Sequence, residues 1–203
     1  SLGGYQPFES GLYEFIIKQA YIDHSESDAM NVNLILTDSN QRELRITEYI
    51  TGGRDKGCKP YYIGKKGKNE GKKIPLPGYS KMNSLLLTVL GKEISECELE
   101  EKQVLVYDKT AQGQVPKARK VFIELINERV AAGVLQVKSD KTTKESGYKD
   151  PTGETRLSNE VDKWFESETL LTLPEKKKAA ETGETPTAKF AEEWKKKWDG
   201  QLK

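Results

Sequence analysis

The alternation of apolar and polar residues between residues 31 and 50 constrains the fold of this chain more than any other feature. Side chains of a β-strand point to opposite faces in turn, so an alternating pattern predicts a strand with one buried face. A turn signal, Asp38-Ser39-Asn40, interrupts the pattern and predicts a hairpin. The apolar positions of this hairpin are Val32, Leu34, Leu36, Leu44, Ile46 and Ile50.

Further strands are predicted on both sides of the hairpin. Residues 12–22 are rich in β-branched and aromatic side chains, and 104–107 and 119–126 have similar compositions. Residues 130–137 either extend the last of these strands or add another. A helix is predicted before residues 104–107, because apolar residues recur there at i, i+3, i+4, i+7 and i+8 and form one buried face. Gly91 is expected to end this helix. The apolar stripe of the helix consists of Met82, Leu85, Leu86, Val89 and Leu90.

The order of these elements predicts a mainly β fold. Three strands, a linker with a helix, and two more strands match a five-stranded OB-fold barrel, which has its helix between strands 3 and 4. We assign residues 1–137 to this barrel domain. A long basic insertion, residues 52–78, interrupts it and is called the basic arm below.

The composition changes after residue 137 and predicts a C-terminal extension. Residues 138–174 are expected to form a polar extension with a short helix, because Val161, Trp164 and Phe165 have helical spacing. Residues 175–203 are expected to hold a charged linker and a terminal helix. The linker, 175–184, is low in complexity, which is typical of disorder.

The terminal helix is bracketed by Thr185-Pro186 and Gly200, which are typical start and stop residues. Phe190, Trp194 and Trp198 recur every four residues and form an aromatic face. This face either docks on the protein's own barrel or binds in the groove of a partner. The three aromatic residues are therefore candidate partner-binding residues.

The basic arm carries the strongest functional signal. Residues 52–73 hold eight basic and two acidic residues, a net charge of +6 in a chain whose total is +1. Lysines neutralise phosphates, and tyrosine rings stack on unpaired bases with little sequence preference. The alternative is a solvated hairpin whose tyrosines pack on the barrel. The candidate nucleic-acid-binding residues are Arg54, Lys56, Lys59, Tyr61, Tyr62, Lys65, Lys66, Lys68, Lys72 and Lys73.

Four residues outside the arm are added to this candidate surface. Arg45 and Tyr49 lie on the polar face of their strand, and the outer face of strands 2 and 3 is the usual binding surface of an OB fold. Arg119 and Lys120 begin a later strand and are expected to flank the same groove. All four are ordinary exposed residues in the alternative interpretation.

Catalytic and metal-binding patterns are scarce. His24 lies in a polar turn without a paired nucleophile, and the two cysteines, Cys58 and Cys97, are far apart. The glycine- and lysine-containing stretches lack the spacing of a phosphate-binding loop. We expect no enzyme activity, no cofactor and no metal. No apolar run approaches the about 20 residues that cross a membrane, so no membrane association is expected.

Several segments together resemble the phage-encoded single-stranded DNA-binding proteins of OB-fold type. They are "SGLYEFIIKQAYI", the basic Gly/Lys/Tyr insertion, "PGYSKMNSLLLTVLG" and "YKDPTGETRLSNEVDKWF". The resemblance implies a protein that coats unwound DNA in phage replication or recombination, in the cytoplasm of an infected bacterial host. Its partners would be single-stranded DNA and phage or host replication and recombination proteins. The C-terminus is lysine-rich, whereas bacterial single-stranded DNA-binding proteins recruit partners through an acidic tail.

Three alternatives remain open from the sequence. The chain is an RNA- or duplex-binding OB protein, a replication or recombination scaffold that acts through its terminal helix, or a nuclease with dispersed carboxylates. Stacking tyrosines favour unpaired bases, because paired bases offer no free faces.

Overall fold

The computed structural model describes residues 6–143 and 150–203. The chain divides into two compact units. One contains Phe15–Val130, and the other combines the residues up to Glu14 with Ala131–Lys203. Strands β1 and β8 each contribute residues to both units.

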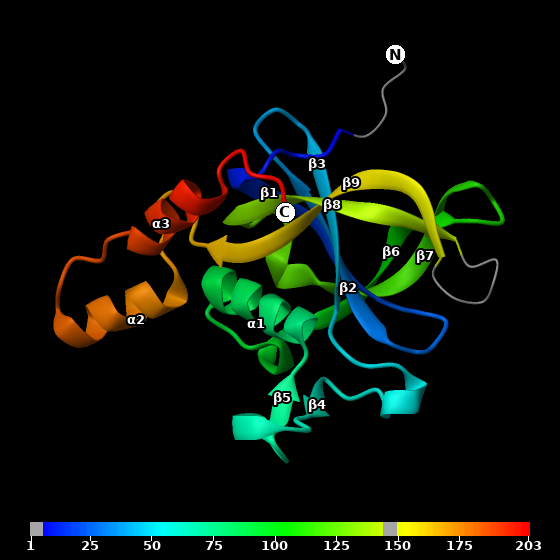
Figure 1. Ribbon diagram of the computed structural model, residues 1–203, viewed down its shortest axis with the longest axis horizontal. Coiled ribbons are helices and arrows are strands. Elements are labelled where there is room, and N and C mark those ends of the chain that lie inside the picture. Colours follow the sequence, from blue (N-terminus) through cyan, green and yellow to red (C-terminus); the bar gives the residue numbers. More distant parts are fainter. Residues whose placement is uncertain (1–5, 144–149) are drawn as a thin grey trace. The chain divides into compact units, whose positions relative to one another are not determined.

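An antiparallel sheet forms the Phe15–Val130 unit, in the order β3-β2-β1-β7-β6 (Figure 1). Its strands are β1 (Gly11–His24), β2 (Met30–Thr37), β3 (Glu43–Tyr49), β6 (Leu99–Asp108) and β7 (Gly113–Phe122). The predicted hairpin is confirmed, since Leu34 pairs with Ile46 and both are buried. The predicted strand 119–126 is shifted toward the N-terminus: β7 covers Gly113–Phe122, and Ile123–Leu125 form a 3₁₀ turn.

The predicted helix is confirmed as α1 (Pro77–Leu90), which follows the third strand and precedes β6. Met82, Leu85 and Leu86 of its stripe are buried. Gly91 ends it in the left-handed conformation, with φ of 69° and its N–H donated to the carbonyl of Leu87. At the other end, Gly78 touches the backbone of Tyr49: a Cβ there would lie 2.2 Å from the Tyr49 carbonyl oxygen.

Two more strands, β8 (Arg129–Thr143) and β9 (Asp150–Phe165), extend the sheet to seven. Over the described residues the sheet does not close on itself. Residues 130–137 thus form a separate strand, and the sheet has two strands more than the five predicted. Residues 147–149 of the turn-rich "GYKDPTGE" stretch lie outside the described residues.

The short helix predicted around Val161, Trp164 and Phe165 is wrong, because these residues belong to β9. A β-bulge explains the error. Gly133 pairs with Lys163 and Val134 pairs with Val161, so one extra residue of β9 is inserted at Asp162. The insertion puts Val161 and Trp164 on the same face of the strand, and their separation of three positions imitates a helical pattern.

The expected disordered linker is also wrong, because α2 (Leu173–Thr182) spans most of it. Thr172 and Glu175 form a reciprocal capping box at its start, and Pro174 occupies its first turn. Gly183 ends it with φ of 70°. These local signals stabilise a helix that has no buried residue.

The terminal helix is confirmed as α3 (Lys189–Trp198), although it begins after Ala188 and not at Thr185-Pro186. Its aromatic face packs inside its own unit. Trp194 is 4% exposed, clusters with Leu135 and Phe165, and donates its indole N–H to Asp162 at 2.8 Å. The ring lies so close to Gly133 that a Cβ there would be 2.8 Å from it.

Candidate nucleic-acid interface

The basic arm forms a small antiparallel hairpin apart from the main sheet (Figure 1). Its strands are β4 (Tyr61–Ile63) and β5 (Lys73–Pro75), and each is preceded by a 3₁₀ turn, Arg54–Lys56 and Gly67–Asn69. Gly64 closes the outer end by donating its N–H to the Lys72 carbonyl at 2.9 Å. The arm therefore has its own backbone hydrogen bonds.

The root of the arm is closed by bonds within the arm and attached to residues 27–28 through Arg54. The N–H of Gly52 bonds to the Lys59 carbonyl at 2.8 Å, and the N–H of Leu76 bonds to the Pro60 carbonyl at 2.9 Å. Arg54 donates its backbone N–H to Ser27, and its guanidinium lies 2.5 Å from the Asp28 carboxylate. The hydrogen bond to Asp28 also raises the pKa of Arg54. Arg54 thus anchors the arm, with its charge already compensated.

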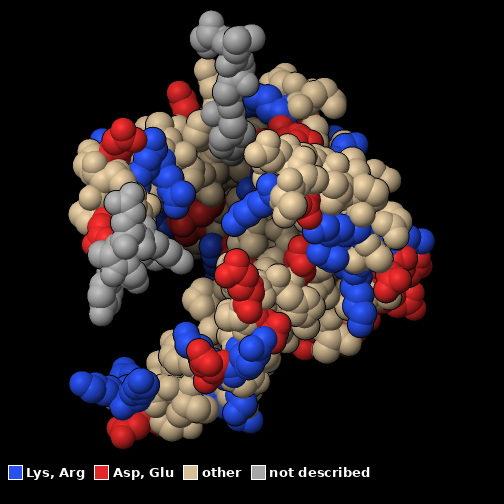
Figure 2. Space-filling view, turned by 90° about the vertical axis from the view of Figure 1, so that its right-hand side faces the viewer, with Lys and Arg blue, Asp and Glu red and all other residues tan. Residues whose placement is uncertain are grey.

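The arm lysines differ from Arg54 in this respect. All seven are exposed, and in the described part of the chain none has an acidic partner within ion-pair distance. Basic side chains accordingly gather on the lowest part of the molecule, where the arm lies, with a few acidic atoms among them (Figure 2). The lysines are Lys56, Lys59, Lys65, Lys66, Lys68, Lys72 and Lys73.

A hollow of about 720 Å³ lies against β4 at the root of the arm. Tyr62 is 51% exposed at this hollow, and Tyr61 is half-buried. The ammonium of Lys73 lies 4.8 Å from the centre of the Tyr61 ring. The hollow combines flat and apolar surfaces with three ammonium groups. Its lining residues are Gly52, Lys56, Lys59, Tyr61, Tyr62, Ile63, Lys65 and Leu76.

Strands β2 and β3 have a polar face, and β3 ends just before the arm begins in the sequence. Tyr49 ends β3 with its side chain 50% exposed, and the register pairs it with Asn31. Because Gly78 packs on the Tyr49 backbone, both ends of the arm meet at this tyrosine. Arg45 lies on the same face, 2.9 Å from Glu43. The face thus offers one free aromatic ring and one paired guanidinium.

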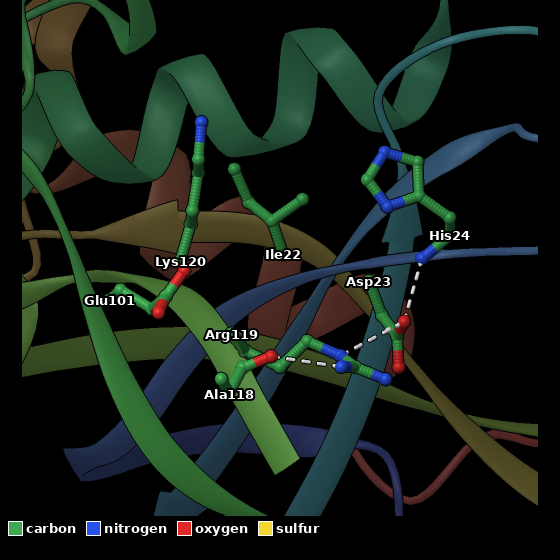
Figure 3. A pocket seen from close by; sticks show the side chains of 7 residues that line it. All are labelled: Ile22, Asp23, His24, Glu101, Ala118, Arg119 and Lys120. Carbon is green, nitrogen blue, oxygen red and sulfur yellow. Dashed lines mark hydrogen bonds and ion pairs between the residues drawn. The ribbon is translucent and has the colours of Figure 1, made fainter.

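Arg119 and Lys120 lie next to each other near the end of β7 and line one cleft. They are neighbours on β7, so their side chains lie on opposite faces of the sheet. Figure 3 shows Arg119 reaching toward Asp23 while Lys120 extends toward α1. The cleft measures about 360 Å³. It lies next to the pair Tyr21–Val121, where β1 and β7 meet, and is lined by the following residues of β1 and the preceding residues of β7. That both residues flank the groove of Arg45 and Tyr49 stays a prediction.

Arg119 lies on the same face of the sheet as Arg45. Its Nε lies 3.1 Å from the Asp23 carboxylate. Burial raises the pKa of Tyr21, as does the nearby Asp23 carboxylate, while the guanidiniums of Arg45 and Arg119 act in the opposite direction. The register puts Tyr21 on the same face of the sheet as both arginines, because Tyr21 pairs with Val121 and, through Asn33, aligns with Thr47.

The three candidate partner-binding residues differ in their exposure. Trp194 is covered by β8 and β9, while Phe190 is 38% exposed and Trp198 is half-buried. Of the two alternatives for the aromatic face, docking on the chain's own strands is the one present in the structure. Trp194 is therefore not available to a partner in this conformation.

Within the described residues, no group of three or more His, Cys, Asp or Glu side chains is arranged to hold a metal ion. His24 is exposed, and its backbone N–H bonds to the Asp23 carboxylate. Among the described helices, none combines the length and apolar character of a membrane span. No model of a known protein family matches the chain, and no curated protein is significantly similar to it.

Proposed function

We propose that this chain binds single-stranded DNA without sequence specificity and without catalysing a reaction. The observation that carries the proposal is the arm, which combines two tyrosines with seven exposed lysines that have no acidic partner among the described residues. Unpaired lysines release counterions from phosphates, which supplies most of the affinity in non-specific binding. The tyrosines add stacking of about 1–3 kcal/mol per base.

The strand would run from the arm onto the polar face of β2 and β3. Tyr49 supports this path, because its half-exposed ring stands where both ends of the arm meet. Arg45 and Arg119 lie further along the same face of the sheet. We also propose an OB-fold relationship for the Phe15–Val130 unit, because three strands, α1 and two strands follow one another there apart from the arm. An OB fold binds oligonucleotides on the corresponding strands.

The resemblance to phage single-stranded DNA-binding proteins is part of the same proposal. It assigns the chain a role in coating unwound DNA during replication or recombination. Single-stranded RNA offers the same phosphates and bases, so the test includes it. A scaffold that acts through α3 is disfavoured, because Trp194, at the centre of its aromatic face, is covered by its own unit.

The test is a fluorescence anisotropy titration with three ligands of equal length: a DNA strand, the same strand as a duplex, and its RNA counterpart. We expect the single strand to bind at least tenfold more tightly than the duplex. Equal affinity for the duplex contradicts the contribution of base stacking. Tighter binding of RNA reassigns the substrate class.

A further inference from the structure

We infer that the hollow at the root of the arm is a binding site for one unstacked nucleotide, which receives the base and both of its flanking phosphates. This inference rests on the proposed function and adds to it a discrete subsite. Neutralisation of phosphates by scattered lysines alone requires no such subsite.

The chemistry of the walls fits a nucleotide. Tyr61, Tyr62 and Ile63 present flat and apolar surfaces, which suit a base. Lys56, Lys59 and Lys65 line the same hollow and have no acidic partner among the described residues. A nucleotide within a strand has one phosphate on each side, so three ammonium groups are sufficient for both.

The size of the hollow also fits. Sites for small molecules commonly measure about 300–1,000 Å³ and combine apolar walls with a few polar groups. The hollow, at about 720 Å³, has room for a nucleoside with two phosphates. A duplex cannot present a base to it without breaking a pair, which costs a few kcal/mol.

The walls are held in place without a ligand. Lys73 lies over the Tyr61 ring but is not among the residues that line the hollow, so it steadies the ring and leaves the hollow open. The backbone hydrogen bonds of Gly52 and Leu76 close the root on both sides. The ion pair of Arg54 with Asp28 holds the turn that carries Lys56. A preorganised site loses less entropy when it binds.

The experiment titrates thymidine 3′,5′-bisphosphate into the full chain and follows methyl and aromatic NMR signals. We expect the signals of Ile63, Tyr61 and Tyr62 to shift and those of Tyr49 to remain in place. Deoxyribose 3′,5′-bisphosphate, which lacks the base, should bind at least fivefold more weakly. Tyr62→Ala should remove this difference, and Tyr62→Phe should preserve it, because stacking needs only the ring.

Two outcomes would overturn the inference: equal binding of the two bisphosphates, or shifts confined to Tyr49. A DNA strand titrated into the same sample separates the two proposals. If the strand binds while the bisphosphate leaves the hollow unchanged, the subsite is refuted and the proposed function stands. If the strand does not bind but the bisphosphate does, the proposed function fails and the chain is a nucleotide-binding protein.

Discussion

At the scale of single residues, the basic side chains fall into two groups. Arg45, Arg54 and Arg119 each contact a carboxylate of the same unit. The arm lysines contact none in the described part of the chain. A guanidinium whose charge is compensated by a carboxylate attracts a phosphate less strongly, which reduces its net contribution to binding. We therefore assign the phosphate contacts mainly to the lysines and the anchoring of the arm to Arg54.

Asp108, at the tip of the β6–β7 hairpin, gives a prediction for pH dependence. Hydrogen bonds from the Lys117 ammonium and from the backbone N–H groups of Ala111 and Thr110 lower its pKa to about 2. Folding thus favours the ionised carboxylate. This contribution to stability is fully present above the ordinary pKa of about 4 and is lost as the pH falls through 2.

We expect a carbon-13 NMR titration to give Asp108 a pKa near 2. Asp108→Asn should speed amide hydrogen exchange at the hairpin tip at pH 7, because the charged acceptor is lost. A titration midpoint near the ordinary value of about 4 would show that the three hydrogen bonds do not persist in solution.

At the scale of elements, the arm depends on close backbone packing at Gly64. A Cβ at this position would lie 1.9 Å from the carbonyl oxygen of Asn69, which is a backbone atom that cannot yield without opening the turn. Gly67 and Gly71 have open space around them, although each has a positive φ. The three glycines therefore allow a steric clash to be compared with simple backbone strain.

We predict that Gly64→Ala disrupts the outer end of the arm and weakens the binding of a DNA strand at least fivefold. Gly67→Ala is the matched control and should cost only about 1 kcal/mol of local strain, with a smaller effect on binding. Both affinities are measured by anisotropy, and thermal unfolding should be similar for the two variants. Equal affinities for both variants would mean that the arm's shape is irrelevant to binding.

Helix α3 gives the second prediction at this scale. Trp194→Ala should destabilise its unit by about 3–5 kcal/mol, because a buried aromatic ring is lost. Phe190→Ala should cost clearly less, since that ring is 38% exposed. Urea unfolding followed by circular dichroism measures both values. Similar small losses in the two variants would show that α3 does not dock as the structure has it.

The elements also show what could be predicted from the sequence. The hairpin of residues 31–49 and helix α1 were predictable, because alternation and the i, i+3, i+4 spacing each match one structure. Residues 161–165 were not, because the bulge at Asp162 gives a strand the spacing of a helix. Helix α2 was missed because low complexity outweighed the capping signals of Thr172 and Gly183.

The candidate site was predictable to a similar extent. Composition alone identified the lysines and tyrosines of the arm. The hollow was not predictable, since it depends on how Gly52 and Leu76 close the root. The pairing of Arg54 with Asp28 also escaped prediction, because the partners are 26 positions apart in the chain.

At the scale of the whole molecule, the proposed activities belong to one unit. The arm, Tyr49 and the two arginines on the face of Tyr21 lie within Phe15–Val130, while α2 and α3 belong to the other unit. The positive charge is concentrated in the same unit, because residues 52–73 have a net charge of +6 in a chain whose total is +1. The proposed function therefore depends above all on the arm lysines, which would neutralise the phosphates of a single strand.

The salt dependence of binding tests this claim most directly. The affinity for a DNA strand is measured at several salt concentrations for the wild type, for a triple variant (Lys65→Ala, Lys66→Ala, Lys68→Ala), and for a control (Lys177→Ala, Lys178→Ala, Lys196→Ala). The control removes the same charge from exposed positions of α2 and α3. Each lost phosphate contact should lower the slope of log K against log salt by about 0.7, so the arm variant should lose about 2. The control should keep the wild-type slope. Equal slopes for the arm variant and the wild type would contradict the account.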